Sequence, residues 1–171
     1  AGPPVDTPPQ ETAYRWQRET LSDHPDNGWM GTELALVFDS ENQPWVAARA
    51  LPQDQLHLFW RDGDGWQHEE VPLGKAGFDP QLHWHNERLW LSTGNQETAE
   101  PPRLTLSQRD REGTWTHRVL IEAYDDLPGR YHQTLRRGDH TEFCAYHPSL
   151  QGVVWGRVST QVPVPNPDAG T

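Results

Sequence analysis

Residues 66–71 read WQHEEV, and this short stretch decides the fold because two other stretches resemble it. Residues 16–21 read WQRETL, and residues 115–120 read WTHRVL. The tryptophans that open these stretches lie about 50 residues apart, and self-similarity at a fixed period of that length is typical of repeat architectures. The chain is therefore predicted to contain three copies of one structural unit.

Each unit continues, after its opening tryptophan, with three runs in which apolar and polar residues alternate. The runs are about 4–7 residues long and are bounded by Gly, Pro, Asn and Asp, which is typical of half-buried strands joined by tight turns. No segment has the apolar spacing of an amphipathic helix. The predicted strands are residues 34–39, 82–86 and 132–136, then runs that begin near Trp45, Trp90 and Phe143, then residues 56–60, 104–107 and 153–158.

This pattern predicts an all-β, propeller-like fold of three four-stranded antiparallel units. The opening strand would lie outermost in a blade, so the stretch around Trp16 becomes the natural partner of the last strand, residues 153–158. Three blades are fewer than the usual minimum of about four. We therefore expect either half of a six-bladed ring, closed by a homodimer, or part of a longer propeller with further blades.

Proline-rich segments flank the repeats and lack any periodicity. Residues 1–13 are predicted to form an extended N-terminal arm, and residues 162–171 a C-terminal tail or linker. The three-repeat domain then occupies residues 14–161.

Composition limits the classes of partner. The chain is only 33% hydrophobic but contains nine Trp, which suits thin sheets packed through large aromatic side chains. Its 25 acidic residues against 14 Lys and Arg give a formal charge of −11, which repels nucleic-acid phosphates and tolerates sugars or metal ions. No apolar run is long enough to span a membrane. We expect an extracellular or periplasmic protein.

Two turns carry a short motif ahead of a repeated tryptophan, in residues 61–66 (RDGDGW) and 107–115 (SQRDREGTW). An aspartate there can accept hydrogen bonds from turn N–H groups, a glycine permits positive φ, and the tryptophan fills the space between sheets. These turns resemble the Asp-box, or bacterial neuraminidase, repeat of sialidase-like β-propellers, which has the form Ser-x-Asp-x-Gly-x-Thr-Trp. The first turn lacks the Ser and Thr, and the second has an extra residue between Ser107 and Asp110.

The resemblance implies a propeller fold and says little about activity. Sialidase catalysis, as that family implies, needs three arginines for the substrate carboxylate, a tyrosine nucleophile paired with a glutamate, and an acidic proton donor. The spacing of the arginines and tyrosines in this chain identifies no such set, so no catalytic residue is predicted. A glycoside hydrolase or lyase on a propeller scaffold remains an alternative function.

Tryptophans supply the candidate binding residues. Trp60, Trp84 and Trp155 are less tied to the repeat than the other tryptophans, so we expect them to be exposed and to stack on sugar rings. The leading hypothesis is a non-catalytic binding protein of propeller type that recognises carbohydrate or a protein surface.

Histidines supply a second candidate site. His83 and His85 share one face of a strand because side chains alternate along it, and His132 begins the corresponding strand of the next unit. Three imidazoles that converge on one point would suit Zn or Cu. The alternative is that these histidines are exposed or bound to backbone carbonyl groups.

Overall fold

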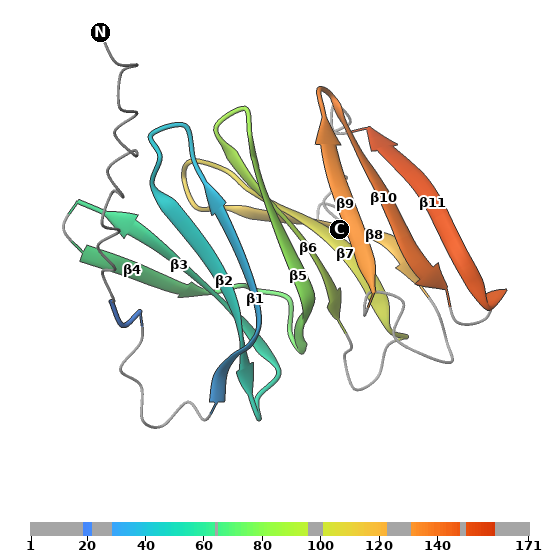
Figure 1. Cartoon of the computed structure of the whole chain (residues 1–171), viewed down its shortest axis with the longest axis horizontal. Helices are drawn as coiled ribbons and strands as arrows, with labels where there is room; N and C mark the ends of the chain where they lie inside the picture. Colours follow the sequence, from blue (N-terminus) through green and yellow to red (C-terminus); the bar gives the residue numbers. More distant parts are fainter. Residues whose placement is uncertain are drawn as a thin grey trace, which may run out of the picture.

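The computed structural model describes residues 19–21, 29–63, 65–95, 101–122, 131–147 and 150–159. These residues form three antiparallel sheets and no α-helix, and within each sheet the strands follow one another in sequence order (Figure 1). The first sheet contains β1 (Trp29–Phe38), β2 (Pro44–Leu51), β3 (Gln55–Asp62) and β4 (Gly65–Glu70); the second contains β5 (Ala76–His85), β6 (Arg88–Asn95), β7 (Arg103–Arg109) and β8 (Trp115–Glu122); the third contains β9 (His132–Arg137), β10 (His140–His147) and β11 (Gly152–Ser159).

The sheets stand one after another like the blades of a propeller (Figure 1). The first strand of the second sheet, β5, contacts β1 and β2 of the first sheet and β9 of the third. Trp66 and Trp115 open β4 and β8, which are the outermost strands of their sheets. The predicted all-β, propeller-like fold with three repeated units is therefore confirmed, together with the outer position of these two opening strands.

Several predictions fall on residues outside the described part of the chain. These are the arm at 1–13, the tail at 162–171 and the opening strand around Trp16, so the domain boundaries stay predictions. The third sheet has three strands within the described residues, and β11 is its edge. Glu19, which is described, lies beside the first sheet, where its carboxylate binds Arg61 and Trp66.

An apolar core lies between the first and second sheets. Because side chains alternate along a strand, Trp45 and Ala47 of β2 both point toward the second sheet. They pack there against Leu82 of β5 and Leu91 of β6. Nearly all of these side chains are removed from water, which is the dominant stabilising contribution. The buried members of the cluster are Trp45, Ala47, Leu56, Leu58, Val71, Leu73, Leu82, Leu89 and Leu91.

The Asp-box-like turn between β7 and β8 has the geometry that its sequence predicts. The Asp110 carboxylate accepts a hydrogen bond of 2.7 Å from the Thr114 N–H, and Gly113 has a φ of 87°. Trp115, the residue after Thr114, packs against the core between the first two sheets. The motif therefore acts as a turn and a packing element.

Candidate functional site

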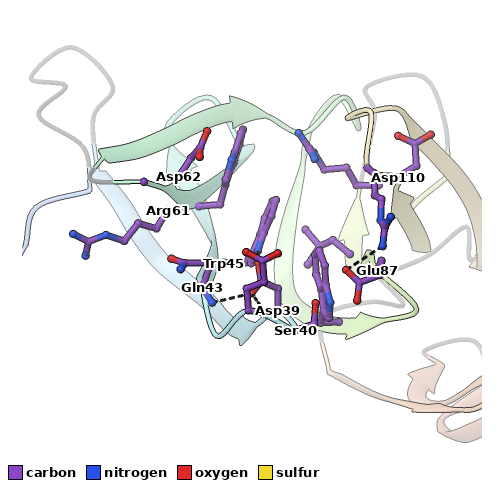
Figure 2. A pocket seen from close by; sticks show the side chains of 15 residues that line it. Asp39, Ser40, Gln43, Trp45, Arg61, Asp62, Glu87 and Asp110 are labelled. Atoms are coloured by element: carbon purple, nitrogen blue, oxygen red, sulfur yellow. Dashed lines mark hydrogen bonds and ion pairs between the residues drawn. The ribbon is translucent and has the colours of Figure 1, made fainter.

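A cavity of about 420 Å³ opens where the turns of the first and second sheets meet (Figure 2). The β1–β2 and β3–β4 turns line one side, and residues from β5 through the β7–β8 turn line the other. Its volume lies in the range of small-molecule sites. The residues that line it are Asp39, Ser40, Glu41, Gln43, Trp45, Trp60, Arg61, Asp62, Gly63, Trp84, Glu87, Leu89, Arg109, Asp110 and Arg111.

Three stacked tryptophans form the aromatic wall of the cavity. Trp45 and Trp60 are cross-strand partners on β2 and β3, with ring centroids 5.2 Å apart and planes 12° apart. Trp84 comes from β5 of the second sheet and stacks on Trp45 at 5.5 Å. Trp45 is buried between the other two, whereas Trp60 and Trp84 are partly exposed. Two of the three predicted stacking residues therefore meet in one cavity.

The third predicted stacking residue, Trp155, lies elsewhere. It sits on β11 of the third sheet, 65% exposed, and does not line the cavity. The structure therefore brings Trp60 and Trp84 together and leaves Trp155 apart from them.

Asp39 fixes the entrance turn and the central tryptophan. One carboxylate oxygen accepts hydrogen bonds from the backbone N–H groups of Glu41 and Gln43, at 2.9 and 2.8 Å. The other accepts the Trp45 indole N–H at 3.0 Å. This carboxylate is occupied in holding the site together, and Figure 2 shows it at the β1–β2 turn.

A glutamate joins the two sheets beneath the cavity. The Glu69 carboxylate on β4 binds the Arg109 guanidinium at 2.8 and 3.0 Å and accepts the Trp115 indole N–H at 2.8 Å. The same guanidinium lies 4.9 Å from the centroid of Trp60, within the range of a cation–π contact. Arg109 is thereby held over the aromatic wall.

The same arrangement occurs once more along the chain. Glu19 binds Arg61 at 3.0 and 3.1 Å and the Trp66 indole at 2.9 Å. These contacts hold the pKa of Glu19 below its ordinary value, through Trp66 first and Arg61 second. Glu19 and Glu69 each lie three residues after an opening tryptophan of the repeat, Trp16 or Trp66, and that shared offset is a sequence signal for this clamp of a glutamate on an arginine and a tryptophan.

The rim of the cavity mixes charges of both signs. Arg111 pairs with Glu87 at 3.3 Å, and Asp110 is engaged by its own turn. Glu41 and Asp62 are exposed. The rim therefore offers carboxylate acceptors and guanidinium donors around an aromatic wall, a combination suited to a polyhydroxylated ligand.

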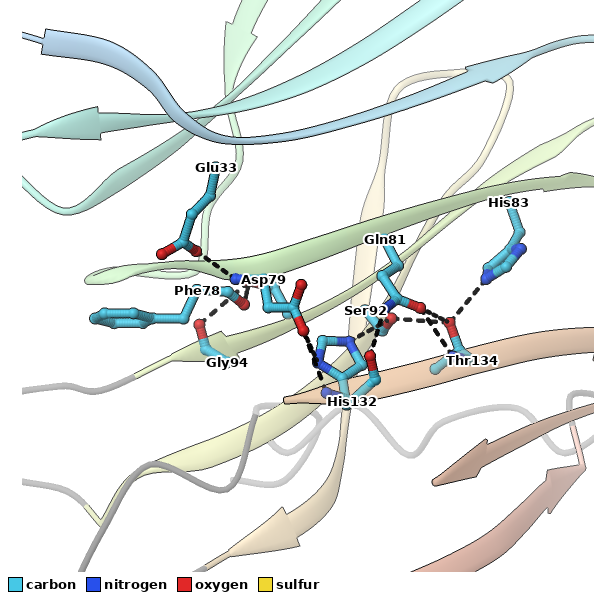
Figure 3. A network of polar contacts seen from close by, with 10 residues as sticks. Glu33, Phe78, Asp79, Gln81, His83, Ser92, Gly94, His132 and Thr134 are labelled. Carbon is cyan, nitrogen blue, oxygen red and sulfur yellow. Dashed lines mark hydrogen bonds and ion pairs between the residues drawn. The ribbon is translucent and has the colours of Figure 1, made fainter. Parts of the chain in front are cut away.

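The predicted histidine site takes a different form. His83 and His132 both join a buried polar network between the second and third sheets (Figure 3). His83 Nε2 lies 2.7 Å from the Thr134 hydroxyl, and His132 Nε2 lies 2.9 Å from the Ser92 hydroxyl. Within the described residues, no group of three or more His, Cys, Asp or Glu side chains could hold a metal ion.

His85 lies at the end of β5, opposite Arg88 on β6. The three predicted ligands, His83, His85 and His132, are therefore not gathered into a metal site. The physical reason is that the Nε2 atoms of His83 and His132 are each hydrogen-bonded to a hydroxyl group, that of Thr134 and that of Ser92 respectively. Zn or Cu binding gains no support from this geometry.

The network also places a serine, a histidine and an aspartate in the order found in a hydrolytic triad. His132 lies between the Ser92 hydroxyl at 2.9 Å and the Asp79 carboxylate at 3.6 Å. Ser92 is fully buried, and its hydroxyl also lies 3.0 Å from that of Thr134. A nucleophile must reach its substrate, so this set serves as a polar contact between sheets.

Comparison with known proteins gives a likeness in structure alone. No family model matches the chain, and no curated protein matches it. A GH43 endo-arabinanase from Bacillus licheniformis is similar in structure, with a TM-score of 0.45 and 14% sequence identity over 74% of this chain. The chain spans about half of that protein, since the match covers 52% of the arabinanase. The narrower resemblance to sialidase-like propellers rests on two turns and stays a prediction.

Among the described residues, none forms a helix of the length and apolar character that crossing a membrane requires.

Proposed function

We propose that this chain is a non-catalytic binding protein that recognises carbohydrate in the cavity between the first and second sheets. The observation that carries the proposal is the pair of partly exposed tryptophans, Trp60 and Trp84, on one wall of a 420 Å³ cavity with a charged rim. Aromatic faces pack against the C–H faces of sugar rings, and charged side chains bind hydroxyl groups.

The charge of the site favours a neutral sugar. Arg61 and Arg109 are already paired with glutamates, and Arg111 is paired with Glu87. Glu41 and Asp62 remain exposed at the rim, and the whole chain carries a formal charge of −11. Uronic or sialic acids would meet repulsion there, so the proposed ligand class is a neutral oligosaccharide.

Binding is favoured over hydrolysis by the state of the five carboxylates that line the cavity: three are engaged by turns or by an arginine, and the other two, Glu41 and Asp62, are exposed to water at its rim. A glycosidase needs two carboxyl groups free to exchange protons or attack on either side of one bond. Asp39 holds the β1–β2 turn and Trp45, and Asp110 holds the β7–β8 turn. Extracellular or periplasmic location fits this function and stays a prediction.

The test is calorimetric titration of the chain with a panel of neutral oligosaccharides. Trp60→Ala should weaken binding at least tenfold, about 1.4 kcal/mol, because it removes an aromatic face. Val119→Ala, an exposed apolar position on β8 outside the cavity, is the matched control and should bind like the parent. Circular dichroism confirms that each variant is folded.

Three outcomes would overturn the proposal. One is that no neutral oligosaccharide binds. Another is that Trp155→Ala weakens binding while Trp60→Ala does not, which would place the sugar on the third sheet. Release of reducing ends during incubation would contradict the non-catalytic part and favour a hydrolase.

A further inference from the structure

The first strand of the first sheet exposes a row of apolar side chains that points away from the second sheet. Leu34, Leu36 and Phe38 alternate along β1, so they share one side of the sheet, and they are half or more exposed. Ala35 and Val37, on the opposite side of the strand, pack into the core beneath the second sheet. We name the exposed side, defined by Leu34, Leu36 and Phe38, the leading face.

The third sheet exposes a second apolar face at the other end of the array (Figure 1). Val153 and Trp155 on β11 are 75% and 65% exposed, and their register partners on β10 include Tyr146. Trp155 pairs with Cys144 of β10, and Leu135 of β9 pairs with Glu142, two residues away on the same strand. Leu135 therefore lies on the same side of the sheet as Trp155. We name this side, defined by Leu135, Tyr146, Val153 and Trp155, the trailing face.

The repeat shows what a leading face does inside the chain. Leu36 and Leu82 are equivalent in the repeat. Leu36 pairs with the residue after Trp45 on β2, and Leu82 pairs with the residue after Trp90 on β6. Leu82 is only 7% exposed because it packs onto the first sheet. By the same alignment Phe38 is equivalent to Trp84, which stacks on Trp45. In the second sheet this face is therefore buried by the sheet before it.

The repeat also shows what a trailing face does. His83 and Leu135 both lie two residues before the end of the first strand of their sheets, where a two-residue turn follows. His83 faces the third sheet, since it contacts Thr134. Leu135 holds the corresponding position with no following sheet among the described residues. The trailing face is thus the side that, within the chain, receives the next sheet.

We propose that the trailing face of one copy of this chain binds the leading face of a second copy, head to tail, and that two such contacts close a ring of six sheets. The argument for this occupant is that one chain carries both halves of an interface already formed twice within it, between its own successive sheets. Six blades fall within the usual range of about 4–8, and a head-to-tail contact that closes forms a ring and not a filament. Both exposed faces are covered by the closure, as large apolar patches in stable proteins usually are.

The experiment measures the mass of the chain in solution by light scattering from micromolar to submillimolar concentration. The parent should be a dimer that dissociates on dilution. Leu36→Glu and Trp155→Glu change different faces, and each should give a monomer, because a buried unpaired carboxylate is costly. Val119→Glu, a 43%-exposed apolar position on the outer strand of the second sheet, should remain dimeric. Circular dichroism and thermal unfolding establish that each variant is folded.

A mixing test separates this contact from a symmetric one. Leu36→Glu alters only the leading face, and Trp155→Glu alters only the trailing face. A mixed pair of the two variants therefore retains one unaltered contact, and mixing should restore part of the dimer. In a dimer that joined two trailing faces, Leu36→Glu would have no effect and mixing would restore nothing.

Three results would overturn the proposal. The parent chain could remain monomeric across the whole concentration range. Leu36→Glu could leave the dimer intact, which would show a contact through another surface. Mixing the two variants could fail to recover any dimer. Each result concerns assembly alone, so the sugar site in the cavity is tested separately.

Discussion

Glu69 joins the first two sheets through its contacts with Arg109 and Trp115 of the second sheet. Glu69→Gln keeps the size of the side chain but removes its charge and one acceptor oxygen. The ion pair with Arg109 and the hydrogen bond from the Trp115 indole N–H are therefore both weakened. We expect the free energy of unfolding to fall by about 1–3 kcal/mol, measured by urea denaturation. Glu112→Gln, in the exposed β7–β8 turn, is the control, and an equal loss there would contradict the clamp.

Histidines buried between strands should make stability depend on pH. The pKa of His83 lies below its ordinary 6.5, first because burial disfavours the imidazolium and then because Arg136 is near. Burial likewise lowers the pKa of His117. The unfolded chain then binds these protons more readily than the folded one, so stability is full above about pH 6.5 and declines as the pH falls below it.

His83→Gln should therefore flatten the fall in unfolding free energy between about pH 7 and 5. Urea denaturation of parent and variant at several pH values measures this slope, and the double variant with His117→Gln should flatten it further. An unchanged slope in both variants would show that other groups carry the dependence.

The sequence predicted Trp60 and Trp84 as binding residues because they exceed what the repeat requires; the two side chains line one cavity, and their binding role stays a prediction. It missed Glu69, whose one sequence signal is the offset of three residues from a tryptophan that it shares with Glu19, because that offset does not identify the partner of the carboxylate. It expected a metal at His83, His85 and His132, but the hydroxyl groups that bind His83 and His132 lie 51 and 40 residues away in the sequence and have no distinctive spacing.

At the scale of the element, β11 contains a glycine where a side chain does not fit. Gly156 pairs with Phe143 of β10, and a Cβ at that position would overlap the phenyl ring. Gly156→Ala should lower the free energy of unfolding by about 1–3 kcal/mol, because the ring must leave its place. Gly152→Ala on the same strand meets only the Leu150 carbonyl at 3.6 Å, so it should be tolerated.

The double variant Gly156→Ala with Phe143→Leu tests the cause. A smaller side chain relieves the overlap, so the loss on adding the methyl group should be less in the Phe143→Leu background than in the parent. Denaturation of the four proteins measures this coupling. Additive effects would show that the glycine is needed for its backbone and not for the space.

The elements themselves were largely accessible from the sequence. Period-two alternation located the strands, and Asp110 with Gly113 marked a turn whose hydrogen bond and positive φ are both present. What alternation does not reveal is which face meets which neighbour. The polar contact between Ser92 and Thr134 was therefore not predicted, because serine and threonine also occur on strands that face solvent.

At the scale of the whole molecule, the repeat predicted three units in series, and it explains why the ends of the series are unlike its middle. The middle sheet has both faces covered, one by an apolar core and one by hydrogen-bonded polar groups. Each end sheet leaves apolar side chains exposed, along β1 in the first sheet and across β9, β10 and β11 in the third. Whether a second copy covers those faces determines how heat should unfold the protein.

Association that stabilises only the folded state makes the midpoint of thermal unfolding, Tm, rise with protein concentration. For a dimer that unfolds as it dissociates, each tenfold increase adds about 1.4 kcal/mol to the unfolding free energy of the pair. The parent and Val119→Glu should show this rise in calorimetry, and Leu36→Glu should have a Tm independent of concentration. A parent Tm that stays constant over the same range would mean that the exposed leading and trailing faces do not meet in solution.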